Sequence, residues 1–278
     1  MRFGISTHLF HDRRLDREHL AQIAEYGFEA VELFATRSHF DYHDRDAVGR
    51  LGGWLREAGL TLHSVHAPIT DAFTSAGWSP TYSTAHTDAA RREASVREAG
   101  VAIAIAKDLP FEILVVHLGT PAALNNPGDN DRRAAAKSFA EICRLAAPLG
   151  VRVAAEVIPN RLSEPGPLVA MLEDELEEHA GICLDFGHAH LLGDVADAIE
   201  TAAEHVIATH VHDNRGRTDE HLVPYLGSID WDLALVTMQK IGYEGTYTME
   251  LAGTGSPGEV LEEARRARQR FERTLAHA

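Results

Sequence analysis

Six successive apolar segments of the chain each end in a side chain that could bind a metal ion or move a proton. Carboxylates in such segments, as in residues 152–157, are costly because a buried charge is unfavourable unless it is paired or bound to a cation. A shared divalent ion would remove that cost, since carboxylates and neutral imidazoles then become its ligands. The pattern therefore predicts one metal site built from distant residues: His66, His117, Glu156, Asp185, His210 and Glu250.

Each of these side chains has an ordinary explanation when it is taken alone. A lone histidine at a strand end, such as His66 or His117, is more often a hydrogen-bonded core residue than a ligand. Glu156 could form a buried ion pair, and Asp185 could cap a turn or a helix. Agreement at six segment ends is what favours the metal site over these separate explanations.

The elements that must position these residues alternate between strand-like and helix-like segments. Strand-like runs occupy residues 3–6, 30–34, 62–66, 113–117, 152–157, 182–186, 206–212 and 246–251. Helical spacing occupies residues 16–26, 46–58, 89–106, 132–149, 168–179, 195–204, 231–241 and 257–276. This alternation predicts parallel strands joined by helices, and about 35 residues for each of the units suits a (β/α)8 TIM barrel.

We therefore predict an α/β chain forming one TIM-barrel domain over residues 1–278. The rival fold, a doubly wound open sheet, usually carries a glycine-rich phosphate loop after its first strand, and none follows residues 3–6. Two connections are longer than the fold requires, at residues 68–87 and 212–230. Both follow carboxyl-terminal strand ends, where such barrels build their sites, and we expect Trp78 in the first to contact substrate.

Charge and composition exclude several classes of function. The chain of 278 residues has 26 Lys and Arg against 42 Asp and Glu, a net charge of −16, which disfavours a duplex-binding surface. It contains no apolar run of about 18 residues that could span a membrane, and its start reads as a strand rather than a signal peptide. Two cysteines are too few for a disulfide framework, so we expect a cytoplasmic protein.

The motifs around these residues resemble those of the xylose isomerase-like TIM-barrel superfamily, over essentially the whole chain. This group includes sugar epimerases, hydroxypyruvate isomerase, inosose dehydratase and endonuclease IV. The most specific parts are Asp185-Phe186-Gly187-His188 and His210-Val211-His212-Asp213-Asn214. Residues 219–221, with the stretch 227–231, are also characteristic.

The resemblance implies roles for single residues. In ketose epimerases of this group one divalent metal is held by a set that matches Glu156, Asp185, His210 and Glu250. Substrate contacts match His188 and one of two arginines, Arg215 or Arg217. Such a ligand set suits Mn²⁺, Mg²⁺, Co²⁺ or Zn²⁺. The three-zinc cluster of endonuclease IV adds ligands that match His66, His117, His188, Asp219 and His221.

Two enzyme functions follow as competing hypotheses. The first is a metal-dependent isomerase or epimerase acting on a sugar or sugar phosphate, with Glu156 and Glu250 moving a proton through a metal-stabilised enediolate. The alternative is a multinuclear zinc phosphodiesterase, an AP endonuclease, or a dehydratase or lyase on the same scaffold. Residues 68–87 contain no Lys or Arg, which makes a nucleic-acid partner unexpected. A non-catalytic sugar-binding barrel is a third hypothesis. Because barrels of this group often pair, the resemblance also implies a homo-oligomer.

Overall fold

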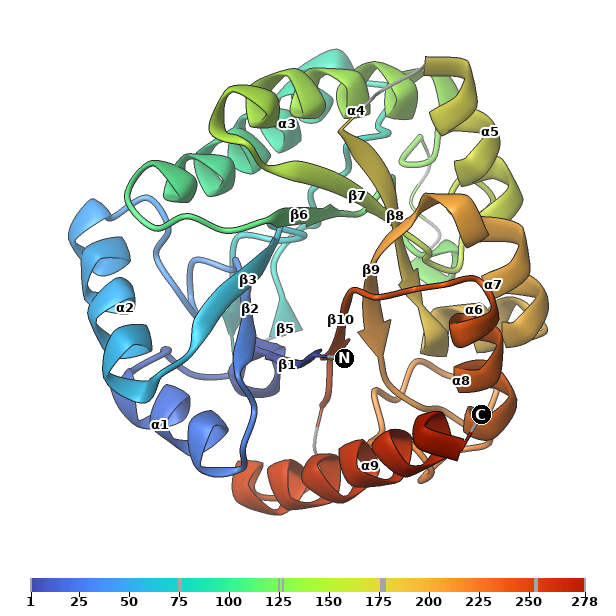
Figure 1. Cartoon of the computed structure of the whole chain (residues 1–278). Helices are drawn as coiled ribbons and strands as arrows, with labels where there is room; N and C mark the ends of the chain where they lie inside the picture. Colours follow the sequence, from blue (N-terminus) through green and yellow to red (C-terminus); the bar gives the residue numbers. More distant parts are fainter. Residues whose placement is uncertain are drawn as a thin grey trace.

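The computed structural model describes residues 2–74, 77–124, 126, 128–175, 179–252 and 255–277. Eight parallel strands close into a barrel in the order β1-β10-β9-β8-β7-β6-β3-β2, with helices around the outside (Figure 1). The TIM barrel predicted from the sequence is confirmed. The strands are β1 (Arg2–Ser6), β2 (Ala30–Phe34), β3 (Thr61–His66), β6 (Ile113–Val116), β7 (Arg152–Glu156), β8 (Ala180–Asp185), β9 (Val206–Val211) and β10 (Thr246–Met249).

The helices that surround the barrel begin and end close to the predicted bounds. They are α1 (Arg17–Glu25), α2 (Arg45–Ala58), α3 (Ala89–Ile103), α4 (Arg132–Ala146), α5 (Pro165–Glu175), α7 (Val195–Ala202), α8 (Trp231–Lys240) and α9 (Pro257–His277). Aspartates cap the start of many of them, because a carboxylate accepts the free backbone N–H groups of the first turn. Such caps include Asp16, Asp44, Asp88, Asp131, Asp194 and Asp230.

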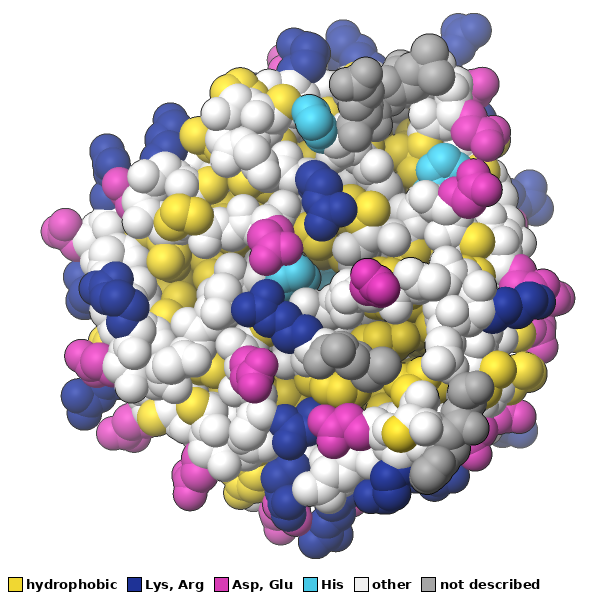
Figure 2. Space-filling model, viewed as in Figure 1, with side chains coloured by type: hydrophobic (Ala, Val, Ile, Leu, Met, Phe, Trp, Pro, Cys, Tyr) yellow, Lys and Arg dark blue, Asp and Glu magenta, His cyan; other side chains and the backbone are white. Residues whose placement is uncertain are grey.

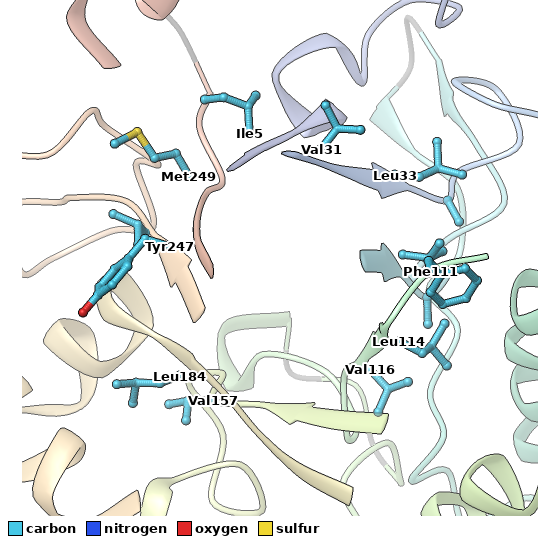
Figure 3. Packing of buried hydrophobic residues seen from close by; sticks show 14 of the residues in the cluster. Ile5, Val31, Leu33, Phe111, Leu114, Val116, Val157, Leu184, Tyr247 and Met249 are labelled. Carbon is cyan, nitrogen blue, oxygen red and sulfur yellow. The ribbon is translucent and has the colours of Figure 1, made fainter. Parts of the chain in front are cut away.

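The two faces of each barrel strand carry different chemistry. Residues such as Ile5, Val31 and Leu184 point away from the barrel interior and pack under the helices (Figure 3). The opposite faces meet inside the barrel, where Cys183 lies in a small apolar layer with Ile113, Val115, Ala154 and Ala208. Side chains two residues further along a strand share its face, so this layer forms the floor beneath the polar residues at the carboxyl-terminal strand ends.

Two short elements were not predicted. Helix α6 (Phe186–Leu192) follows β8 directly, and the hairpin β4 (Phe73–Thr74) and β5 (Gly77–Trp78) lies within the long 68–87 connection. Both are too short to show a period in the sequence. The hairpin is continued by an antiparallel bridge between Thr70 and Thr81.

The surface of the barrel mixes charges of both signs. On the face seen in Figure 2, Lys and Arg side chains are interspersed with Asp and Glu around the rim rather than gathered into one patch. Within the described part of the chain, no helix combines the length and the apolar character needed to cross a bilayer.

Candidate active site

The polar residues at the strand ends meet at the carboxyl-terminal end of the barrel. Glu156 pairs in register with Cys183 on β8, and Asp185 with His210 on β9, which sets the side chains side by side. Four residues have potential ligand atoms within 4.8 Å of one another, and all four are buried. We call Glu156, Asp185, His210 and Glu250 the deep group. It contains every residue that the family resemblance implies for a single metal.

The deep group has two buried polar atoms without a hydrogen bond. Nδ1 of His210 lies 3.2 Å from Oε1 of Glu156 and 3.6 Å from Oε2 of Glu250. Neither Nδ1 of His210 nor Oε1 of Glu156 has a hydrogen-bonding partner. Two ligands of one Zn²⁺ at about 2.0–2.2 Å from the ion stand roughly 3–3.5 Å apart, so this spacing fits a shared cation. The residues present therefore fit a divalent metal.

A second set of ligand atoms shares Glu156. Its Oε2 lies 3.1 Å from Nε2 of His66 and 3.0 Å from Nε2 of His117, and these three residues form a further group that could hold an ion. Nδ1 of His66 can donate to the Ala67 carbonyl oxygen at 2.8 Å. When the ring is neutral, that bond leaves the lone pair on Nε2, where it can bind an ion shared with Glu156.

A third set lies nearer the mouth of the barrel, and we call it the rim group. It consists of His188 on α6, His212 after β9, and Asp219 and His221 from the 212–230 connection. Oδ2 of Asp219 lies 3.1 Å from Nε2 of both His188 and His221. The Asp219 side chain is 39% exposed, whereas the carboxylates of the deep group are 0–4% exposed.

The rim group depends on an unusual local backbone. His221 has φ of 47°, a left-handed conformation that is costly for a residue with a side chain. Gly187 makes room for another member of the rim group, because a Cβ at this position would stand 2.0 Å from the His212 ring. That contact explains the glycine of the Asp185-Phe186-Gly187-His188 motif. Asp185 also caps α6, accepting from the His188 backbone N–H at 2.6 Å.

Asp213 fixes the connection that carries Asp219 and His221. Its buried carboxylate accepts five hydrogen bonds, from four backbone N–H groups and the indole of Trp231. The donors are Asn214 at 2.8 Å, Tyr225 at 3.0 Å, Ser228 at 3.1 Å, Ile229 at 3.2 Å and Trp231 Nε1 at 2.8 Å. Gly227 stands against this carboxylate, where a Cβ would come within 2.2 Å of Oδ1.

Carboxylates and imidazoles shift one another's pKa values in the metal-free chain. Burial alone would lower the pKa of His66, but the hydrogen bond and charge of Glu156 raise it to about 9. Asp219 likewise outweighs burial at His221 and raises its pKa to about 9. Burial would raise the pKa of Glu156, yet the charges of His117 and His210 hold it well below its ordinary value. A metal ion must therefore compete with protons for these nitrogens.

A cavity of about 440 Å³ opens above these groups. Glu250, His66, His117 and three rim-group residues line its base, while Glu156 lies behind them. Its walls include Phe34, Ile69, Tyr82, Pro121 and Leu124. Among the described residues that line it there is no Lys or Arg.

Sequence reasoning missed Glu32 and assigned no ligand role to His212 or His8. Glu32 on β2 lies 3.1 Å from Nε2 of His210, and His212 lies 3.0 Å from Asp185. His8 lines the cavity, and its Nδ1 can donate to the Leu251 carbonyl oxygen at 3.2 Å. Burial, together with nearby histidines, lowers the pKa of His8 well below its ordinary value, so it is neutral. A carboxylate inside a strand-like run was the available signal for Glu32.

Two of the residues expected to contact substrate, Arg215 and Arg217, are absent from the described lining of the cavity, and the prediction for Trp78 stays open. Arg215 is exposed and pairs with Glu220 instead. Arg217 is exposed and is absent from the described lining. The backbone of Trp78 belongs to β5, but its side chain lies outside the described residues. His188 does line the cavity.

Comparison with known proteins decides the family. A model of the xylose isomerase-like TIM barrel matches residues 20–272. The chain belongs to this family. An uncharacterized protein of Methanocaldococcus jannaschii, MJ1311, is 28% identical over 258 residues, covering 90% of this chain and 83% of the relative. The family resemblance seen in the sequence is thus confirmed.

Solved structures of the family share the whole fold at low identity. A D-tagatose 3-epimerase-like protein superimposes with a TM-score of 0.81 at 24% identity, covering 99% of this chain and 97% of the other. The D-psicose 3-epimerase of Clostridium cellulolyticum H10 gives 0.79 at 18% identity, with 99% of both chains covered. An L-ribulose 3-epimerase gives 0.78 at 18%, with 99% and 97% covered. At these identities the likeness establishes the fold.

Proposed function

We propose that this protein is a divalent-metal-dependent sugar isomerase or epimerase. The observation that carries the proposal is the deep group, in which Glu156 and Glu250 face Nδ1 of His210 from two different strand ends, and Glu250 lines the cavity. Neighbours with the same fold named as sugar 3-epimerases support it. Glu156, Asp185, His210 and Glu250 would hold the ion.

The bound ion would supply Lewis acidity toward a carbonyl and the neighbouring hydroxyl of the sugar, which makes the hydrogen on the adjacent carbon acidic. Mn²⁺, Mg²⁺, Co²⁺ and Zn²⁺ all suit a set of three carboxylates and one imidazole. The ordinary requirement for such ligands is that the carboxylates are ionised. Glu156 meets it, because its pKa is held well below the usual range by His117 and His210 against the effect of burial.

The two glutamates are the proton-transfer groups in this proposal. One carboxylate takes the proton from the carbon beside the carbonyl, and the electron pair of the C–H bond moves toward the carbonyl oxygen to give an enediolate. Glu156 ends β7 and Glu250 follows β10, so β8 and β9 separate them around the barrel. A proton returned by the second carboxylate from the opposite face inverts that carbon. Return to the adjacent carbon isomerises the sugar.

The cavity favours an uncharged sugar over a sugar phosphate. A phosphate dianion is usually held by Lys, Arg or a set of backbone N–H groups. Residues 75, 76, 125, 127, 253 and 254, which are not described, are Ser, Ala, Asn, Pro, Gly and Thr, so none of them adds a cationic side chain. Neutral His8 offers Nε2 as an acceptor for a hydroxyl, and His188 lines the same cavity.

Phosphodiester hydrolysis on a multinuclear centre is the second candidate. The specific observation in its favour is that the described residues form four groups that could each hold an ion, two of which share Glu156. Their members include all the positions that match the endonuclease IV pattern. The lack of Lys and Arg around the described cavity opposes it, because DNA-binding sites contact phosphates mainly through such residues.

Metal counting and hydrogen exchange together test the proposal. The chain is stripped with chelator, reloaded separately with Mn²⁺, Co²⁺ or Zn²⁺, and assayed by elemental analysis for ions per chain. Ketoses and ketose phosphates are then incubated with each form in D₂O and followed by NMR. We expect one tightly held ion and deuterium at the carbon beside the carbonyl of an unphosphorylated ketose.

The opposite result is equally clear. Three tightly held ions, cleavage of an abasic DNA duplex and no exchange with any sugar would reject the isomerase and establish the second candidate. Exchange with ketose phosphates alone would keep the chemistry but reject the uncharged substrate.

A further inference from the structure

We propose that Glu32 is a positioning residue that sets which nitrogen of His210 faces the deep group. The inference rests on the proposed function, because it assigns Glu32 to support of the metal ligand. Glu32 is on β2 and His210 on β9, and β1 and β10 separate these strands in the barrel. Their contact therefore crosses the interior rather than following a strand pair.

The contact is short and fully buried. Oε2 of Glu32 lies 3.1 Å from Nε2 of His210 and accepts a hydrogen bond from Oγ of Ser64 at 2.9 Å. The side chains of Glu32 and His210 are each 1% exposed. Water therefore does not compete for Nε2, and Glu32 is the described carboxylate within hydrogen-bonding distance of it.

The chemistry of the pair decides the tautomer. An ionised carboxylate only accepts hydrogen bonds, so Glu32 requires the ring proton on Nε2. A neutral imidazole carries one ring proton, which leaves the lone pair on Nδ1, directed at Glu156 and Glu250. Those two carboxylates would otherwise attract the proton to Nδ1 and block that nitrogen as a ligand. Glu32 counters them from the other side of the ring.

A purely structural role explains Glu32 poorly. Oε1 of Glu32 is buried without a hydrogen-bonding partner, and a half-satisfied buried carboxylate costs stability. An apolar residue would pack the interior at lower cost. Carboxylates that hold the outer nitrogen of a metal-bound histidine are a recurrent arrangement, and their loss weakens metal affinity about 10–100-fold.

The test compares three variants with the wild type. Glu32→Ala removes the acceptor, whereas Glu32→Gln keeps an amide oxygen at nearly the same volume and can accept from Nε2. Glu98→Gln is the matched control, because Glu98 pairs with Nε2 of His43 at 2.9 Å outside the site. Each metal-free protein is titrated with Co²⁺ alone, and both the dissociation constant and the visible spectrum are recorded.

We expect Glu32→Ala to weaken Co²⁺ binding about 10–100-fold and to change its spectrum. Glu32→Gln is expected to recover much of the affinity, and Glu98→Gln to behave as the wild type. A loss of thermal stability without a change in Co²⁺ affinity or spectrum would establish a structural role and overturn the inference. Should Glu32→Ala fail to fold, Glu32→Leu takes its place, because an apolar side chain of similar volume fills the space but cannot accept from Nε2. Weaker Co²⁺ binding with an altered spectrum in that variant supports the inference, and wild-type affinity with an unchanged spectrum overturns it.

The two proposals fail in different ways. A wild-type chain that binds no divalent ion contradicts the proposed function, and the inference is overturned with it. A wild-type chain that binds Co²⁺ normally, beside a Glu32→Ala variant of equal affinity, rejects the role of Glu32 alone.

Discussion

In the deep group every side chain comes from a barrel strand or the residue directly after one, whereas Asp219 and His221 of the rim group come from a long connection. The deep carboxylates are 0–4% exposed, and Asp219 is 39% exposed. Both groups nevertheless bring histidine nitrogens to 3.1–3.2 Å from a carboxylate oxygen. The two regions thus share ligand chemistry but differ in support and in solvent access.

That difference in solvent access determines whether each group requires a cation to balance its carboxylates. Water can solvate the Asp219 carboxylate, so the rim group can exist without a cation at modest cost. Water does not reach Glu156 or Asp185, whose charge must be balanced by protonated histidines or by a metal ion. We therefore expect an ion to bind the deep group more tightly than the rim group.

The largest effect is expected from Glu156, the carboxylate that belongs both to the deep group and to the group with His66 and His117. Glu156→Gln removes a ligand and a proton-transfer group at once, because its two oxygens face His210 on one side and His66 and His117 on the other. Loss of acid–base catalysis alone costs about 10²–10⁴-fold, so kcat for hydrogen exchange should fall at least that far. Stopped assays of deuterium incorporation measure it, and Glu98→Gln serves as the control.

Activity retained in Glu156→Gln would refute its assigned role. Glu250→Gln should also abolish turnover while leaving more of the metal bound. The oxygens of Glu156 lie 3.0–3.2 Å from nitrogens of three histidines, whereas Oε2 of Glu250 lies 3.6 Å from His210 and 3.7 Å from His221. Equal metal loss in both variants would contradict that distinction.

The next largest effect is expected on stability, from Asp213, which holds the connection that carries Asp219 and His221. Asp213→Ala leaves five donors without their acceptor, and we expect a loss of at least about 3 kcal/mol in the free energy of unfolding. The neighbouring Asp230→Ala loses a single cap to the Leu233 N–H and should cost only about 1 kcal/mol. Urea denaturation measures both. One tightly bound ion should remain in Asp213→Ala, and loss of all metal would show that the two groups are not separable.

A smaller effect is expected from pH in the metal-free protein. The pKa of His66 is raised to about 9 by Glu156 despite burial, and that of His221 to about 9 by Asp219. Both lie above the unfolded value of about 6.5, so their stabilisation is complete below that pH and is lost as pH rises toward 9. Thermal unfolding in chelator should therefore show falling stability from pH 6.5 to 9. Added metal should remove most of this loss, and a flat profile in chelator would contradict the pairing.

The sequence predicted the deep group because its residues end regular strands. Apolar runs set the strand positions, and parallel strands bring their carboxyl ends together, so Glu156 and Asp185 could be placed without coordinates. The same reasoning assigned no role to His212, whose contact with Asp185 depends on the space left by Gly187. It also missed Glu32, which lies at a strand position rather than at the end of the run. Neither is visible until the barrel closes.

Arg215 provides the smallest expected effect and separates the family resemblance from the geometry. Its side chain is 61% exposed and is held by Glu220, and exposed ion pairs contribute about 0–1 kcal/mol. Arg215→Ala should therefore change kcat/KM less than about threefold, because losing a pair of this strength hardly moves the rim group. If Arg215 contacted the substrate, Arg215→Ala would instead raise KM at least about tenfold, because a charge-assisted hydrogen bond would be lost. Steady-state kinetics decide between them: the larger value would mean that the 212–230 connection moves to close over the cavity when the sugar binds, so that the rim group, unlike the deep group, is completed by substrate.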